Sequence, residues 1–196
     1  MKTQKCLSIA FLGTALLAGS TLFAQETEED MEYETVVMEK PDMDPSKTIA
    51  VNAGNTADFS TLVAALKAAD LVGTLSGDGP FTVFAPTNAA FENLPEGTVE
   101  SLLKPENKKM LTRILTFHVI AGKINAADVL DLLNKNNGKA KVTTVSGGSL
   151  LFYLDDGDVY IEDETGNTAS LVFTDLDQSN GVIHVIDNVL LPGNKK

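Results

Sequence analysis

The chain has 196 residues, of which 27 are acidic and 15 are basic, and its formal net charge at pH 7 is −12. This excess of negative charge argues against nucleic acid or an anionic membrane surface as the partner. The single cysteine, Cys6, lies in a segment that we expect to be removed, so the mature protein should contain no disulfide, thiol catalyst or thiolate metal site.

Residues 1–24 have the pattern of a cleavable secretory signal. Lys2 and Lys5 precede an apolar stretch, and small residues precede Gln25. The stretch is shorter than the roughly 20 apolar residues of a permanent membrane span. Ser20 stands where lipid attachment would require a cysteine. We therefore predict a secreted or periplasmic protein that begins near Gln25, without a lipid anchor or membrane insertion.

Residues 25–45 form an acidic leader, with nine acidic residues against Lys40 and a net charge of −8. Such a run repels itself and contains few large apolar residues, so we predict that it is disordered. It would serve as a solubilising spacer or as a tail that binds cations or a surface. Residues 46–196 carry a net charge of −6, and their number suits one domain with a single core.

Three segments in the first half have the apolar spacing of amphipathic helices, with start signals at Asp58, Pro105 and Asn125. We expect the first helix to end near Gly73 and the third to end at Asn137-Gly138. The side chains predicted to be buried are Phe59, Leu62, Val63 and Leu66 in the first helix; Met110, Leu111, Ile114 and Leu115 in the second; and Val129, Leu132 and Leu133 in the third.

Strand signals occur once in the first half and dominate the second. Residues 81–84 form a short β-rich run that Pro86 should end, and Thr87 should cap a following helical turn. Further strand-like runs are separated by turns rich in Gly, Asn and Asp, and they cover residues 142–145, 150–154, 159–162, 170–174 and 182–191. This order predicts an α+β domain in which helices pack against an antiparallel-rich sheet that the strand at Phe81 joins.

Two blocks of the sequence resemble the signatures of fasciclin-like domains. Residues 81–91 (FTVFAPTNAAF) resemble the first block, and residues 180–192 (NGVIHVIDNVLLP) resemble the second. Between them, residues 115–120 (LTFHVI) are similar to the family's tyrosine-histidine element, with Phe117 in place of the tyrosine. The resemblance implies a wedge-shaped α+β fold and extracellular proteins that mediate adhesion.

The second block also has a physical interpretation of its own. Asn180-Gly181 is typical of a tight turn, and the residues after it are apolar on both faces of a strand. A strand of this kind should be central in its sheet or covered on both sides. We therefore expect both blocks to serve mainly the fold.

The residue types that usually carry catalysis are scarce. His118 and His184 are the only groups suited to proton transfer near neutral pH, and two histidines are too few for a catalytic zinc site. We expect both to be hydrogen-bonded structural residues. Nucleophile-elbow, phosphate-loop and zincin motifs are absent from the sequence. We therefore expect no enzymatic activity, no cofactor and no bound metal.

Two acidic runs, residues 155–158 and 162–164, could supply oxygen ligands to calcium. Their spacing differs from that of the helix-loop-helix calcium loop, and solvated hairpin turns explain them better.

The family resemblance indicates where a partner could bind. In animal matrix members, an aspartate followed by isoleucine before the second block is linked to integrin recognition, and here Asp175 and Leu176 occupy the similar place. Phe117 and His118 form the other candidate surface. We predict an exported adhesion or binding module for a protein or polysaccharide of the cell surface or matrix, with self-association as a further contact. The alternative is a periplasmic small-molecule-binding or hydrolytic protein, in which His118 and a carboxylate such as Asp175 converge in a cleft.

Overall fold

The computed structural model describes residues 39–193. Its strands form one seven-stranded sheet in the order β2-β1-β7-β6-β5-β4-β3. All neighbours are antiparallel except β1 and β7, which are parallel. The strands are β1 (Phe81–Pro86), β2 (Val119–Ala121), β3 (Lys139–Thr143), β4 (Ser149–Asp155), β5 (Asp158–Glu162), β6 (Thr168–Gln178) and β7 (Gly181–Ile186).

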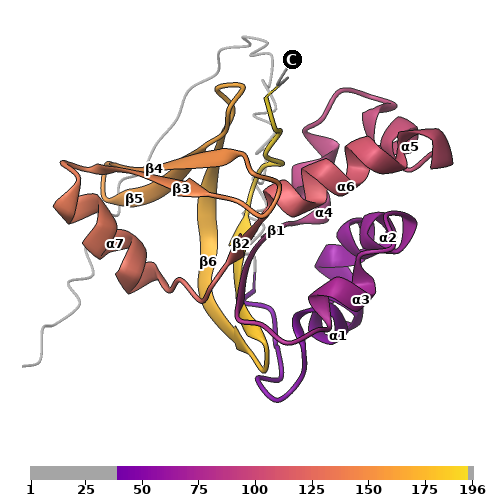
Figure 1. The fold of residues 1–196 in the computed structure, drawn as a ribbon, viewed down its shortest axis with the longest axis horizontal. Helices are drawn as coiled ribbons and strands as arrows, with labels where there is room; N and C mark the ends of the chain where they lie inside the picture. The colour runs from indigo at the N-terminus through magenta and orange to yellow at the C-terminus, as the bar shows by residue number, and fades with distance from the viewer. Residues whose placement is uncertain (1–38, 194–196) are drawn as a thin grey trace, which may run out of the picture. The chain divides into compact units, whose positions relative to one another are not determined.

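The helices divide into two groups. Figure 1 shows α7 on one side of the central strands and the other helices gathered on the opposite side. The helices are α1 (Ile49–Asn55), α2 (Ser60–Ala68), α3 (Val72–Leu75), α4 (Asn88–Glu92), α5 (Thr98–Leu102), α6 (Lys108–Phe117) and α7 (Ala126–Lys135), with 3-10 turns η1 (Ala57–Phe59) and η2 (Pro105–Asn107). The predicted α+β class is confirmed.

Strand β7 is central, as its two apolar faces predict. All six of its residues are buried, and it lies between β1 and β6. Ile183 and Val185 pack into the core beneath α1, α2 and α6, whereas Ile186 packs into a second core with α7, β4 and β5. The backbone of β1 passes so close to residue 181 that only glycine fits there. A Cβ atom on Gly181 would lie 2.0 Å from the carbonyl oxygen of Phe81. The second signature block therefore forms the partition between two hydrophobic cores.

Local capping follows the sequence closely. Thr87 accepts a hydrogen bond from Ala90 N at 3.3 Å and caps α4. Asn125 and Asp128 form a capping box at the start of α7. After α7, Asn137 has a φ of 55°, a left-handed conformation that asparagine tolerates better than most residues. These short-range signals could be recognised because each involves neighbours in the chain.

The first predicted helix is wrong in its details. Asp58 lies inside η1 and makes no capping hydrogen bond, and α2 begins only at Ser60. The helix ends at Ala68 because Asp70 adopts a left-handed conformation with a φ of 60°. The predicted stop at Gly73 instead lies within α3, and α1 was missed.

Met110 was also wrongly predicted to be buried. Its side chain is 57% exposed, whereas Leu111, Ile114 and Leu115 are buried as expected. Met110 therefore lies beside the apolar face of α6 rather than within it.

The packed domain begins earlier than residue 46. Met43 packs against the core beneath α1 and α2, and its sulfur accepts a hydrogen bond from Gln178 Nε2 at 3.2 Å. Asp44 exchanges two hydrogen bonds with the side chain of Asn52, which also bonds the side chain of Gln178. The predicted end of the acidic leader is corrected accordingly. The predicted signal peptide and residues 25–38 of the leader lie outside the described residues.

Within residues 39–193, no helix combines the length and apolarity that crossing a membrane requires.

Candidate functional site

The site begins at an irregularity in β6. The register of β6 against β7 shifts between Phe173 and Leu176, and Asp175 within the shift has a φ of 56°. The shift leaves Asp175 exposed, and its Oδ1 accepts a hydrogen bond from Ala126 N at 2.9 Å. Ala126 is the first residue of α7, where a negative charge is favourable. Asp175 therefore supports the start of α7 while its side chain remains accessible.

His184 connects this irregularity to the interior. Its Nε2 lies 2.8 Å from the carbonyl oxygen of Ile124, and its Nδ1 accepts a hydrogen bond from Asp175 N at 3.3 Å. These partners specify a neutral ring with the proton on Nε2. Burial lowers the pKa of His184, and the ring stacks on Phe84 with 5.6 Å between centroids. His184 is a structural residue, as predicted.

Two further side chains hold residues 122–125, the loop between β2 and α7. Thr82 on β1 donates to the carbonyl oxygen of Gly122 at 2.7 Å and accepts from Ile124 N at 2.9 Å. Lys123 and Asp177, both exposed, form a salt bridge of 2.7 Å. The loop is thus attached to β1, β6 and β7. We call the exposed side chains Lys123, Asp175 and Asp177 the Asp175 surface.

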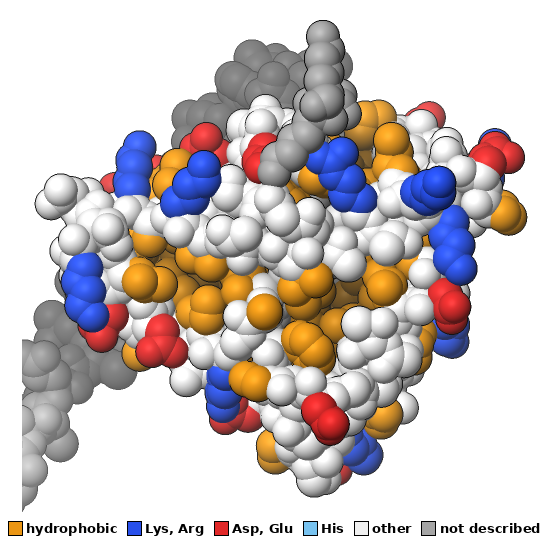
Figure 2. Space-filling view, in the orientation of Figure 1, with side chains coloured by type: hydrophobic (Ala, Val, Ile, Leu, Met, Phe, Trp, Pro, Cys, Tyr) orange, Lys and Arg blue, Asp and Glu red, His pale blue; other side chains and the backbone are white. Residues whose placement is uncertain are grey.

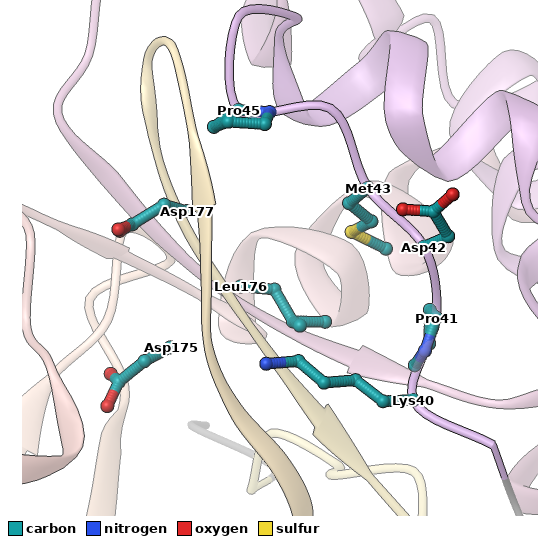
Figure 3. Close-up of a pocket in the computed structure, with 8 residues that line it drawn as sticks. All are labelled: Lys40, Pro41, Asp42, Met43, Pro45, Asp175, Leu176 and Asp177. Atoms are coloured by element: carbon teal, nitrogen blue, oxygen red, sulfur yellow. The ribbon is translucent and has the colours of Figure 1, made fainter.

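A hollow of about 400 Å³ lies beside this surface, between β6 and the N-terminal segment. Figure 3 shows Leu176 and Met43 pointing into it, and the amino group of Lys40 pointing toward β6. The carboxylates of Asp175 and Asp177 point to the other side of the strand, as alternation along a strand requires. The hollow and the carboxylates therefore lie on opposite faces of β6, and the hollow does not gather them into a cation site.

Three of the four predicted partner-binding residues are not accessible. Leu176 is buried in the core beneath α1 and α2, and Phe117 is fully buried in the core beside α7. A Cβ on Gly148 would lie 2.5 Å from the Phe117 ring, so the β3–β4 turn passes directly over it. His118 is 3% exposed. These three assignments are corrected, because each side chain is used inside the fold, and only Asp175 stays a candidate contact.

His118 lies between two backbone groups. Its Nδ1 is 2.9 Å from the carbonyl oxygen of Ile114, and its Nε2 accepts a hydrogen bond from Leu190 N at 3.0 Å. The ring is therefore neutral, with the proton on Nδ1. Burial lowers the pKa of His118 to about 4. The structure does not join His118 to Asp175, as the alternative cleft would need, because each has other partners.

The acidic turn at residues 162–164 is more than a solvated hairpin. Asp163 is 5% exposed and accepts hydrogen bonds from the backbone N–H groups of Thr165, Asn167 and Leu191 at 2.7 to 3.0 Å. The prediction of a solvated turn is wrong for this residue, whose carboxylate fixes the chain end after β7. Among the described residues, no group of three or more His, Cys, Asp or Glu side chains is placed to hold a metal ion.

The connection through Thr82, His184 and Asp175 was missed at the sequence level. These residues are far apart in the chain, so no spacing reveals that they meet. One signal was present, because Thr82 and His184 are the polar residues within two otherwise apolar strands. A buried polar side chain needs a hydrogen-bond partner, so each of the two predicted a polar group of another segment close to its strand.

The sequence matches proteins of one known family. The model of the fasciclin domain matches residues 57–192. The chain belongs to the fasciclin domain family. It is 48% identical to Protein sll1483 of Synechocystis over 193 residues, which covers 98% of this chain and 99% of that protein.

More distant relatives share the domain only. Immunogenic protein MPB70 of Mycobacterium bovis is 37% identical over 149 residues, covering 74% of this chain and 68% of the relative. Cell surface glycolipoprotein MPB83 of the same species is 36% identical, and the match spans 60% of its length. A FAS1 domain pair from the insect cell adhesion molecule Fasciclin I shares the fold, with a TM-score of 0.51 and 24% identity over 66% of this chain and 43% of that one. At the coarse level, this is a domain of the adhesion and binding type.

Proposed function

We propose that this protein is an exported, non-enzymatic binding module that attaches to a protein or polysaccharide of a cell surface or extracellular matrix through the Asp175 surface. The names of its relatives support the setting, because they include a cell surface glycolipoprotein and a cell adhesion molecule. The observation that carries the proposal is the position of Asp175, which is exposed on a rigidly attached loop junction.

The Asp175 surface is suited to recognition because its backbone is fixed from several sides. Hydrogen bonds from β1 and β7 hold residues 122–125, and β6 adds a salt bridge to Lys123 and a hydrogen bond to Ala126, so little conformational entropy remains to be lost on binding. The exposed groups carry both signs of charge, with Asp175 and Asp177 beside Lys123. A surface of this kind can accept hydroxyl and amide donors at its carboxylates and offer an ammonium donor.

The absence of catalysis is part of the proposal. Both histidines are neutral and are bound to backbone groups through both ring nitrogens. A general base needs a free nitrogen within reach of substrate, and neither ring offers one.

The experiment compares two aspartates that share a backbone conformation. Asp175→Asn keeps an oxygen that accepts from Ala126 N and removes the charge. Asp156→Asn makes the same change at an exposed position with a φ of 49°, in the turn between β4 and β5. Mature protein carrying either change is titrated onto cell envelopes of the source organism and onto purified matrix polysaccharides, with bound protein quantified.

We expect Asp175→Asn to weaken envelope or polysaccharide binding on the order of tenfold, as losing a charged contact does, while Asp156→Asn binds like the unchanged protein. Equal binding by all three proteins would remove the Asp175 surface from the proposal. Turnover of polysaccharide or ester substrates by the purified protein would contradict the non-enzymatic assignment.

A further inference from the structure

One edge of the sheet remains available for pairing. The strand order ends at β2 on one side and at β3 on the other. The loop after β3 covers β2, because Val145 N and Ser146 N donate to the carbonyl oxygens of Val119 and Thr116 at 2.8 and 3.2 Å. Among residues 39–193, strand β3 pairs with β4 only, so its outer edge presents backbone donors and acceptors that could accept another strand.

The two faces of β3 differ in chemistry. Lys139 and Lys141 are exposed on one face. Ala140 and Val142 lie on the other and pack toward Val129 and Leu133 of α7. Figure 2 shows hydrophobic side chains gathered in the hollow of the face on which β3, α7 and β2 lie in Figure 1. A strand added at this edge would therefore need acidic residues on one face and apolar residues on the other.

The leader contains a segment with that pattern. Residues 30–37 read DMEYETVV, so Asp30, Glu32 and Glu34 fall on one face of an extended strand, with Val36 at its end. The other face carries Met31, Tyr33, Thr35 and Val37. Tyrosine, threonine and valine are also the residue types that favour strands. The two-residue spacing of Glu32 and Glu34 equals that of Lys139 and Lys141, so both acids can face both lysines in either strand direction.

The leader of the same molecule is badly placed to reach this edge. The described chain begins beside β6, where Lys40 and Met43 line the hollow next to Leu176. Three strand spacings separate β6 from β3, about 14 Å along the sheet, and a strand added outside β3 would lie one further spacing away. Met38 and Glu39 alone lie between the alternating segment and Lys40, and this stretch spans at most about 11 Å. A second copy has no such constraint.

We propose that residues 30–37 of one copy add as a strand to the β3 edge of a second copy, with Glu32 and Glu34 facing Lys139 and Lys141. The contact would combine three interactions: backbone hydrogen bonds along the β3 edge, charge pairs on the face of Lys139 and Lys141, and apolar contacts on the face of Ala140 and Val142. Two copies could exchange leaders reciprocally, or successive copies could form a chain. This self-association does not depend on the partner proposed for the Asp175 surface.

The test uses purified mature protein beginning at Gln25, and it measures self-association by sedimentation velocity over a wide range of concentration. We expect concentration-dependent association. The double change Thr35→Pro with Val36→Pro removes two consecutive backbone donors, one of which faces β3 in either strand direction, and should abolish it. The paired changes Lys139→Glu with Lys141→Glu, and Glu32→Lys with Glu34→Lys, should each weaken it on the order of tenfold by placing like charges opposite each other.

Mixing the two charge-reversed proteins tests whether residues 30–37 of another copy are the strand that occupies the β3 edge. The charges of the leader of one protein then match those of the β3 edge of the other, so heteromeric association should return in the mixture to the strength of the unchanged protein, although each variant alone associates about tenfold more weakly. The matched control is Lys108→Glu with Lys109→Glu, which reverses two exposed lysines on α6 and should leave association unchanged. Melting temperatures of all variants verify that the domain is folded.

Several outcomes would overturn the proposal. They are a monomer at every concentration, normal association of the protein with Thr35→Pro and Val36→Pro, an equal loss in the α6 control, and a mixture that fails to associate. The readout requires no envelope or polysaccharide, so a negative result leaves the proposed function of the Asp175 surface standing, and the reverse also holds.

Discussion

His118 and His184 have the same chemistry in two different surroundings. Each is a neutral imidazole that joins two backbone groups, and burial lowers the pKa of each. His118 joins Ile114 to Leu190, and its partners lie inside the domain. His184 joins Ile124 to Asp175, and Asp175 is exposed.

The difference shows how one residue type can serve architecture in one place and support a surface in another. The His118 contacts fix the end of α6 against the segment after β7, which secures the core. The His184 contacts fix the junction of β6 with residues 122–125, which positions an exposed carboxylate. Experiments that separate stability from binding should therefore separate the two histidines.

The largest effect is expected from His118→Ala. The change leaves Ile114 C=O and Leu190 N–H without partners in a buried site and opens a cavity, at a cost of roughly 3 to 4 kcal/mol at pH 7. His184→Ala should cost about 2 kcal/mol, because Asp175 N and Ile124 C=O lie closer to solvent. Chemical denaturation of both variants at pH 7 measures the two losses of unfolding free energy. A larger loss for His184→Ala would reverse the comparison.

The same comparison predicts a dependence of stability on pH. The pKa of His118 is about 4 in the folded protein, below its usual value of 6.5, so the unfolded chain binds a proton first as the pH falls. Stability is therefore complete above pH 6.5 and decreases toward pH 4, by about 3 kcal/mol for this group. Unfolding free energies measured across this interval test the prediction.

In the His118→Ala protein, the free energy of unfolding should fall less between pH 6.5 and pH 4 than in the unchanged protein. His184 still contributes a decrease of the same sign. An unchanged profile would show that other groups dominate the acid sensitivity.

Asp175 should show a smaller and more selective effect. Asp175→Ala removes the acceptor for Ala126 N and places alanine in a left-handed conformation, so we expect a loss of about 1 to 2 kcal/mol. Asp175→Asn retains the acceptor and suits the same conformation, and its cost should stay within about 0.5 kcal/mol. Thermal unfolding of both variants shows whether Asp175 stabilises α7 by accepting the hydrogen bond from Ala126 N or through its negative charge. Equal losses would indicate that the charge itself stabilises α7.

The smallest effect is expected when residues 25–38 are deleted. The compact unit begins at Glu39, so we expect the unfolding free energy to change by less than about 0.5 kcal/mol. Extending the deletion through Pro45 removes Met43 and Asp44 and should destabilise the domain measurably. Thermal unfolding of the two truncated proteins is the measurement. A large loss from the shorter deletion would show that the leader supports its own domain.

Much of the fold could be predicted from the sequence because the relevant interactions are short in range. The alternation in β7, the Thr87 cap and the Asn125 capping box each depend on residues close together in the chain. The family blocks were visible for the same reason. Apolar periodicity also placed most of the buried face of α6, and it failed at Met110, which lies at the margin of that face.

The candidate site depended on contacts that no local pattern encodes. The sequence showed that Asp175 is an acidic residue near a signature block, and that His118 and His184 are scarce polar groups with structural roles. Only the tertiary structure showed that the register shift in β6 turns Asp175 outward and Leu176 inward. It alone brought Thr82 and His184 to residues 122–125, next to the start of α7 that Asp175 caps, because sheet order sets these contacts across 40 to 60 residues of chain.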